Sequence, residues 1–412
     1  MNIQQLQNGS IEAWTWLLRQ QANMSSDTVI GVQMEPLEYR ATRFSLTLAE
    51  YSEPLSVIGF ETNQTESTFY SRFAAGLNQL PPKSWYEWQN RDGGWVVIEE
   101  NGPYHSPSTW SREDLDRVTE KLAGLHATWW GSDELNNIEL PEHPVVQSFD
   151  FVAMANSIGK ARHDHQKSPI FPQHVGNKNS LLSATSAQGS VIPELMIASV
   201  GFKMLKKLGG WPDLIEGIHM SALEHLLQRP EIMLKPLQHV PLTLLHGQPV
   251  SDNWRINLMD ETHLANWRNV SIGPAVCDLA IFIENYIFWQ TSHPDLHRLV
   301  PGSLEEMLID SYLMHLSENV SLEGEKRPGS SRHIRRYALP AAICWHTISH
   351  WLPTFVTWFG KMPQSRHSWE IADELSPESI AAWGINDLNQ YRPAIGAIFE
   401  RFLDAYKLLV NE

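Results

Sequence analysis

Residues 244–283, LLHGQPVSDNWRINLMDETHLANWRNVSIGPAVCDLAIFI, contain the pattern that decides the fold. The segment begins within a short apolar strand expected over residues 241–247. It contains four polar side chains, which belong to His246, Gln248, Asn253 and Asn266. A histidine can exchange a proton near neutral pH, and amide side chains can hydrogen-bond a ligand carbonyl or hydroxyl. These four side chains are therefore the first candidates for a polar site.

This segment resembles the catalytic segment of the aminoglycoside phosphotransferase and ecdysteroid-kinase-like family. The family pattern reads His-Gly-Asp, then Asn-Trp, then Ile-Asp-Trp, and ends in a Gly-Pro…Asp-Leu-Ala tail. The residues in register with it are His246, Gly247, Asn253, Trp254, Trp267, Gly273, Pro274, Asp278, Leu279 and Ala280. Upstream, LAGLHATWW, ESTFY and VVIEEN are similar to the family's His-bearing helix, its Glu-x-x-Phe-Tyr helix and its hinge, so the resemblance covers about residues 28 to 285.

The resemblance implies an α+β, two-lobed protein-kinase-like fold. A small β-rich lobe is expected over residues 1–102, and a large helical lobe that carries the degenerate catalytic and metal loops is expected over residues 103–412. The apolar patterns agree with this division. They predict strands over residues 28–34, 44–51, 55–60 and 95–100, and helices between the last two strands, over 111–130, over 339–359, and over 385–409 with a break at Pro393.

Two positions that the family uses for catalysis carry amides here. The resemblance places the general base two residues after His246, and that residue is Gln248. The metal-binding aspartate corresponds to Asn266, which leaves Asn253 as a lone amide ligand. A neutral amide cannot act as a carboxylate base, and loss of a general base costs about 10²–10⁴ in rate. Asp252 is either a replacement carboxylate or an ordinary solvated loop residue.

The nucleotide side of the expected cleft is also changed. The family's phosphate-binding lysine should end the third strand, where LSVIGFET offers Gly59 or Phe60. Its partner Glu66 is present and is expected to lack a cation, and Glu99 adds a second carboxylate. The loop between the first two strands, MEPLEYRATRF, has no glycine that would let backbone approach phosphates closely. We therefore expect no cofactor, with Mg-ATP binding weakly or not at all.

The overall charge excludes some classes of partner. The chain has 31 Lys and Arg against 47 Asp and Glu, and its net charge of −16 repels nucleic acid and anionic membranes. Its two cysteines, Cys277 and Cys344, have no metal-type spacing, and the N-terminal residues lack the pattern of a signal peptide. These features predict a cytoplasmic protein without a transmembrane segment.

The expected helical lobe offers a second group of candidates. His346 and His350 are four residues apart on a predicted helix and so share one face, beside Trp345. The resemblance places this region at the family's acceptor-substrate cleft, so these residues are predicted to bind substrate. A metal site and ordinary packing are the alternatives, and no third metal ligand is identifiable. The 17 Trp residues of the chain either fill the core or line a pocket for a small organic ligand of apolar or aromatic character.

Three functions remain open at this point. The first is a repurposed small-molecule enzyme in which His246 and the amides carry out elimination, isomerisation or cyclisation without a nucleotide. The second is a non-catalytic pseudokinase that binds a small molecule or a protein partner. The third is an unorthodox small-molecule phosphotransferase in which Asp252 and Glu66 hold a metal. For His246 and Asn266, a purely structural role that ties backbone segments together is the alternative to a role in a site.

Overall fold

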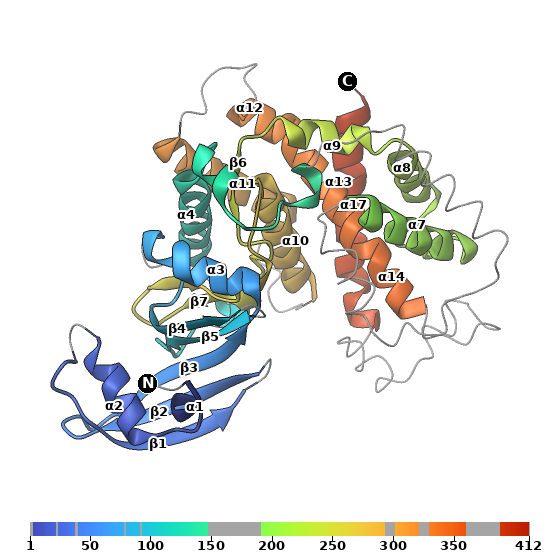
Figure 1. Ribbon diagram of the computed structural model, residues 1–412. Coiled ribbons are helices and arrows are strands. Elements are labelled where there is room, and N and C mark those ends of the chain that lie inside the picture. The colour runs from blue at the N-terminus through green and yellow to red at the C-terminus, as the bar shows by residue number, and fades with distance from the viewer. Residues whose placement is uncertain are drawn as a thin grey trace.

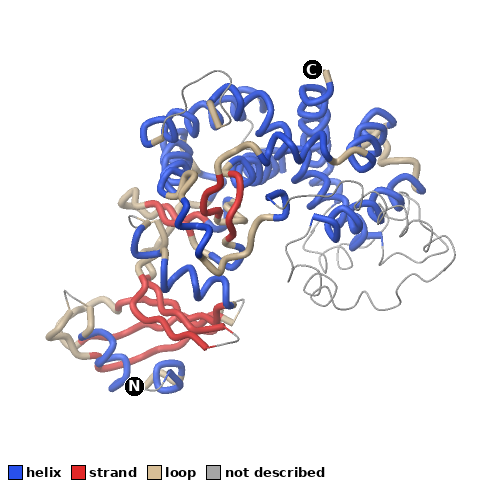
Figure 2. Tube along the Cα trace, turned by 45° about the horizontal axis from the view of Figure 1, so that its top comes forward, coloured by secondary structure: helices blue, strands red, loops and turns tan. Residues whose placement is uncertain are grey.

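The computed structural model describes residues 3–21, 24–37, 40–77, 80–90, 93–146, 191–292, 301–320, 329–359 and 388–411. A β-sheet lobe forms one end of the molecule and a helical lobe forms the other (Figure 1). Helices make up most of the second lobe, and the strands in that lobe are short (Figure 2). These elements confirm the α+β, two-lobed fold expected from the sequence, whereas the exact boundary at residue 102 stays a prediction.

The first lobe is built on a five-stranded antiparallel sheet with the strand order β1-β2-β3-β5-β4. Its strands are β1 (Val29–Pro36), β2 (Ala41–Leu48), β3 (Leu55–Thr62), β4 (Ser84–Asn90) and β5 (Gly93–Glu99). Its helices are α1 (Ile3–Gln7), α2 (Ile11–Arg19) and α3 (Gln64–Arg72). The sequence patterns miss β4, because this edge strand exposes most of its residues and has no regular apolar alternation.

The two faces of this sheet pack into different hydrophobic cores. Val57 and Val97 point toward a small core that α1 and α2 complete. Successive residues of a strand point to opposite faces, and Val96 and Ile98 accordingly join Phe69 of α3 in the large core of the helical lobe. Helix α3 is therefore the element that packs the sheet onto the helical lobe.

The described part of the helical lobe begins with α4 (Arg112–Thr128), α7 (Val191–Lys207), α8 (Gly217–Gln228) and α9 (Glu231–Gln238). Helices α10 (Val276–Ser292) and α11 (Pro301–Asn319) come next, and α11 packs along α4. A run of helix from residue 331 to 359 is made of α12 (Ser331–His333), η8 (Ile334–Ala338), α13 (Leu339–His346), η9 (Thr347–Trp351) and α14 (Leu352–Phe359). The last helix, α17 (Leu388–Val410), packs against α10 and α13, and α14 packs against α7. Both η8 and η9 are π-helical, and none of the described helices meets the length and apolarity needed to cross a membrane.

The break predicted at Pro393 is wrong, because α17 continues through this residue. A proline inside a helix removes one backbone hydrogen bond and crowds the preceding turn. Here the proline lies near the start of a long helix, whose residues Ile395, Phe399 and Phe402 are buried in the large core. Packing along this face compensates for one lost hydrogen bond.

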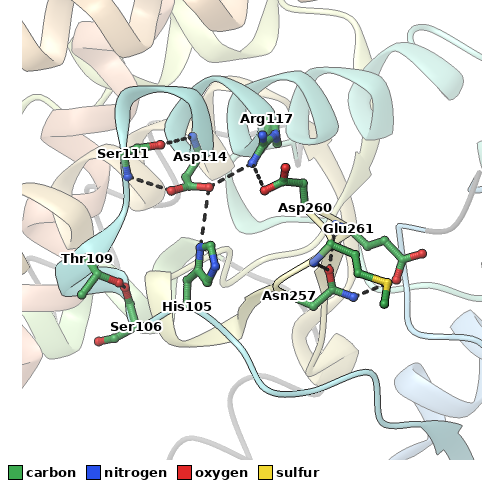
Figure 3. A network of polar contacts seen from close by, with 10 residues as sticks. His105, Ser106, Thr109, Ser111, Asp114, Arg117, Asn257, Asp260 and Glu261 are labelled. Carbon is green, nitrogen blue, oxygen red and sulfur yellow. Dashed lines mark hydrogen bonds and ion pairs between the residues drawn. The ribbon is translucent and has the colours of Figure 1, made fainter.

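A network of polar contacts joins the linker after β5 to the helical lobe (Figure 3). Ser111 and Asp114 form the capping box at the start of α4, with the Ser111 N–H donating to the Asp114 carboxylate at 2.7 Å. Arg117 then donates to Asp114 at 3.1 Å and to Asp260 at 2.9 Å. Asp260 lies in the turn of a small hairpin, so α4, the linker residue His105 and the hairpin are held together.

Two pairs of short strands position the segment that decides the fold. Strand β6 (Leu242–Leu245) pairs with β9 (Ser271–Pro274), and β7 (Trp254–Ile256) pairs with β8 (Thr262–Leu264), both antiparallel. The loop over residues 246–253, here called the catalytic loop, therefore lies against the loop over residues 265–270, here called the metal loop. Gly247 has φ +80, and a Cβ on it would lie 2.1 Å from the carbonyl oxygen of Asn269, so this close approach requires glycine.

Candidate functional site

His246 is fully buried between the catalytic and metal loops. Its Nε2 lies 2.9 Å from the carbonyl oxygen of Ala265, which can only accept, and its Nδ1 lies 3.2 Å from the N–H of Gln248, which can only donate. These two partners select one neutral tautomer, and burial lowers the pKa of His246 against the opposing effect of Asp278. The ring also packs edge-on against Trp267. This geometry agrees with a structural role for His246, and its predicted catalytic role stays a prediction.

Asp278 anchors the catalytic loop from the start of α10. Its carboxylate accepts hydrogen bonds from the backbone N–H groups of His246 and Gly247 at 2.7 Å and 2.9 Å. It also lies 3.4 Å from Nε2 of His126, whose Nδ1 is 2.7 Å from the hydroxyl of Tyr312. With both oxygens engaged and fully buried, this carboxylate holds the loop in place.

The amides at the positions of the family's base and metal ligand form one cluster. Asn253 donates to the carbonyl oxygen of Gln248 at 2.8 Å, and Asn266 donates to the side-chain oxygen of Asn253 at 3.3 Å. Asn269 donates to the side-chain oxygen of Gln248 at 2.8 Å. The side-chain oxygens that would face a hard cation are thus occupied by amide N–H donors. Among the described residues no group of three or more His, Cys, Asp or Glu is placed to hold a metal ion.

Asp252 lies in η5 (Ser251–Asn253), next to this cluster but exposed. Its two neighbours are buried, and the hydroxyl of Ser251 donates to Asn285 at 2.8 Å. Because the buried side of this turn is already filled by its neighbours, the position of Asp252 agrees with a solvated loop residue. Its role as a replacement carboxylate stays a prediction.

Glu66 has a cation beside it, contrary to the expectation from the sequence. Its Oε2 lies 3.4 Å from Nε of Arg268, a residue of the metal loop, and its Oε1 accepts from the Trp267 N–H at 3.1 Å. Burial raises the pKa of Glu66 to about 7, although Arg268 acts to lower it. The rings of Phe69 and Trp267 stack at 3.8 Å in the same place. Glu66 therefore fastens α3 to the metal loop.

Gly59 and Glu99 lie on the other face of the sheet from Glu66. A Cβ on Gly59 would lie 2.4 Å from the Trp95 ring in the small core, and Glu99 lies 3.4 Å from the indole nitrogen of Trp85 in that core. The three residues predicted for a degenerate nucleotide site thus do not meet. Phe60 and Thr62 face α3 from the end of β3, where the Phe60 ring packs edge-on against Tyr70 and the Thr62 hydroxyl lies 2.6 Å from the Ser67 hydroxyl. The strand carries no lysine at this end.

A cavity of about 260 Å³ opens beside the catalytic loop. Gly247 contributes to its lining from the loop, and Trp345, His346 and His350 contribute from α13 and η9. Glu194 of α7 lines it as well, and burial raises the pKa of this carboxyl to about 7. The structure therefore brings the three residues predicted from the helical lobe to one pocket. A larger open groove of about 900 Å³ between α4 and α11 contains no residue predicted for a site.

Below the pocket lies a charged residue that sequence reasoning missed. Glu284 of α10 is only 4% exposed, and its Oε1 accepts from the Trp351 indole at 2.7 Å and lies 3.2 Å from Nε2 of His346. Its Oε2 lies 3.9 Å from Nη1 of Arg401. Burial favours the protonated carboxyl, but His346 and Arg401 together lower the pKa of Glu284 to about 2. The signal in the sequence is a lone acidic residue within the apolar helical run IFIENYIF.

No protein-family model and no curated protein sequence matches the chain. Among solved structures it is similar to an aminoglycoside phosphotransferase from Alicyclobacillus acidocaldarius, with 9% identity, 92% of each chain covered and a TM-score of 0.48. It is also similar to a choline kinase from Cryptosporidium parvum, with 12% identity, 97% of this chain and 96% of that chain covered and a TM-score of 0.44. A macrolide 2'-phosphotransferase from Brachybacterium faecium has 12% identity, coverages of 90% and 97%, and a TM-score of 0.40. The chain is thus similar to small-molecule kinases, and similarity of this degree assigns it none of their activities.

Proposed function

We propose that this kinase-fold chain has lost ATP-dependent phosphotransfer and carries out proton-transfer chemistry on a small organic molecule in the pocket beside Gly247. The observation that carries this proposal is the pocket itself, because it joins the catalytic loop to a group of titratable side chains. Elimination, isomerisation and cyclisation all need a positioned acid or base and no nucleotide.

The way in which the polar groups of the cleft are used supports the proposed absence of Mg-ATP chemistry. The amide oxygens of Gln248 and Asn253 already accept hydrogen bonds, and Arg268 lies against Glu66. Phosphoryl transfer needs metal ligands and a cation to neutralise the phosphates, and Phe60 occupies the strand end where that cation would stand. We therefore propose that the protein works without a nucleotide cofactor.

The pocket lining favours a neutral or amine-bearing molecule with an apolar body. Trp345, Ile197, Ile281 and Pro353 supply apolar surface, and Glu194 supplies a carboxyl group. No Lys or Arg stands among the described residues that line the pocket, so it offers no point charge for a phosphate or carboxylate ligand. A cavity of this kind, mostly apolar with a few polar groups, is typical of a small-molecule site.

A thermal-shift titration tests this proposal. Fragment-sized aromatic amines and neutral heterocycles should raise the melting temperature, since a ligand at about 100 times its Kd stabilises by about 2.7 kcal/mol. Ile281→Trp, which fills the pocket, should abolish the shift, and Leu258→Trp at an exposed hairpin turn should leave it unchanged. Mg-ATP should produce no shift. A shift with ATP that depends on Mg²⁺ would instead support the unorthodox phosphotransferase.

A non-catalytic binding protein is the second candidate function. The hydrogen bonds at both ring nitrogens of His246 favour this candidate, because they hold the ring in one neutral tautomer that is not free to transfer a proton. This candidate predicts ligand-induced stabilisation without turnover of any ligand that binds, and it leaves room for a protein partner. Turnover that depends on a pocket residue would exclude it.

A further inference from the structure

We infer that His346 is the acid–base group of the pocket and that Glu284 is the residue that positions it. The inference rests on the proposed function and gives it a chemical centre different from His246. His346 lines the pocket with 18% of its side chain exposed, whereas Glu284 lies beneath it with 5% exposed. The pair therefore presents one accessible imidazole backed by one buried carboxylate.

The contact between the two residues places a carboxylate beside the imidazole. Nε2 of His346 lies 3.2 Å from Oε1 of Glu284, and in the proposed arrangement the carboxylate stabilises a proton on Nε2, which leaves Nδ1 as the basic atom. No described residue makes a hydrogen bond to Nδ1 of His346, in contrast to Nδ1 of His246, which accepts from Gln248. A histidine oriented in this way by a carboxylate is the arrangement used for general acid–base catalysis.

The surroundings of Glu284 keep it charged although it is buried. The Trp351 indole donates to it at 2.7 Å, and Arg401, itself bound to Glu305 at 2.6 Å, lies 3.9 Å away. Oε2 of Glu284 and two guanidinium nitrogens of Arg401 have no hydrogen-bond partner among the described residues. A buried ion pair with incomplete hydrogen bonding contributes little to stability, and such groups concentrate at functional sites.

The helix geometry at this point is a second, independent observation. The π-helical segment η9 begins directly after His346 and ends at Trp351, so the wide turn brings both donors onto the same carboxylate. The same turn stacks the rings of His346 and His350 at 5.1 Å. Single π-helical turns inside α-helices are rare and occur frequently at functional sites.

The reaction that this pair supports is a proton shift within one molecule. Nδ1 of His346 takes a proton from an acidic C–H or O–H bond, and Glu284 stabilises the imidazolium that forms. The electron pair left behind can form a shifted double bond, and His346 then returns the proton to another atom of the same molecule. Alternatively the electron pair expels a leaving group, which takes up the proton from His346. Neither course consumes an oxidant, a reductant or a second substrate.

The test uses 5-nitrobenzisoxazole, a small aromatic probe of buried bases. Removal of its C–H proton breaks the ring N–O bond and releases a coloured cyanophenolate, so one bond forms to the base and the electrons leave on oxygen. The full chain should accelerate this reaction, and His346→Gln should reduce the rate by about 10²-fold. Added imidazole should restore turnover to His346→Ala, which a structural loss would not allow. Glu284→Gln should also lower the rate, and free imidazole should not rescue it.

A second histidine–carboxylate pair provides matched controls outside the pocket. Nε2 of His315 lies 3.3 Å from Asp116, close to the distance in the proposed pair. His315→Gln and Asp116→Asn should leave the rate unchanged. Turnover by His346→Gln at the wild-type rate would overturn the inference. Probe binding, measured as a thermal shift lost in Ile281→Trp, without turnover would overturn the inference and leave small-molecule binding intact, whereas neither binding nor turnover would count against both.

Discussion

Two polar clusters lie next to Gly247, and they differ in whether their polar atoms are already hydrogen-bonded within the protein. In the catalytic loop, both ring nitrogens of His246 have backbone partners, and the Asn253 side-chain amide donates to the backbone carbonyl oxygen of Gln248. In the pocket, His346 is partly exposed and backed by a charged carboxylate. The catalytic-loop cluster is closed, in the sense that its polar side chains hydrogen-bond to one another or to backbone atoms. The pocket cluster, in contrast, adjoins a cavity. The recognisable family segment and the cavity-lining titratable side chains therefore occupy neighbouring but different parts of this fold.

Glu284→Ala should have the largest effect on stability. It removes the carboxylate between His346 and Arg401 and leaves Arg401, only 8% exposed, with Glu305 as its remaining charge partner. Breaking a buried ion pair by removing one partner costs about 3–5 kcal/mol, and the contact with Glu305 should hold the loss near the lower end of this range. Unfolding by denaturant measures this loss in the free energy of unfolding. Asp404→Ala, which removes an exposed i,i+3 partner of Lys407, is the control. A loss below 1 kcal/mol would mean that the pocket cluster carries no charge.

His246→Gln should cost less, about 2 kcal/mol, because it removes two hydrogen bonds and part of a buried ring. The loss should appear in the melting temperature, and the thermal shift produced by pocket ligands should persist. If His246→Gln abolished ligand binding while the protein remained folded, the closed cluster would belong to the binding site after all.

Gln248→Asp together with Asn266→Asp should create a binding site for Mg²⁺. Two carboxylates would then stand beside Asn253, and Mg²⁺ prefers carboxylate oxygen ligands. We expect Mg²⁺ alone to raise the melting temperature of the double variant by a few degrees and to leave the wild type unchanged. Stabilisation of the wild type by Mg²⁺ would contradict the description of the cluster as closed.

Glu66 should show its effect as a pH dependence of stability. Its pKa is raised to about 7 from a usual value of 4.5, so the folded protein binds more protons than the unfolded chain between these values. The free energy of unfolding should therefore fall as pH rises from 4.5 to 7, and Glu66→Gln should flatten this slope. An unchanged slope in the variant would mean that Arg268 keeps Glu66 ionised throughout.

The strands and the lobe order follow from the sequence because apolar alternation reports which face of a strand is buried. Strand β4 is not predictable in this way, since it is an edge strand with mostly exposed residues. The continuity of α17 is not predictable either, because packing along the helix outweighs the effect of one proline. The cation beside Glu66 stands next to Trp267 in the sequence, but only the fold of the metal loop brings Arg268 across to α3. Likewise, the pairing of Glu284 with His346 joins two helices, which local patterns do not connect.

The most direct measurement compares the turnover of 5-nitrobenzisoxazole by His246→Gln and His346→Gln, at a temperature where both variants are folded. If function has moved from the catalytic loop to the pocket, His346→Gln should lose about 10²-fold and His246→Gln should keep a rate close to that of the wild type. The reverse order, with turnover lost in His246→Gln and kept in His346→Gln, would contradict this account.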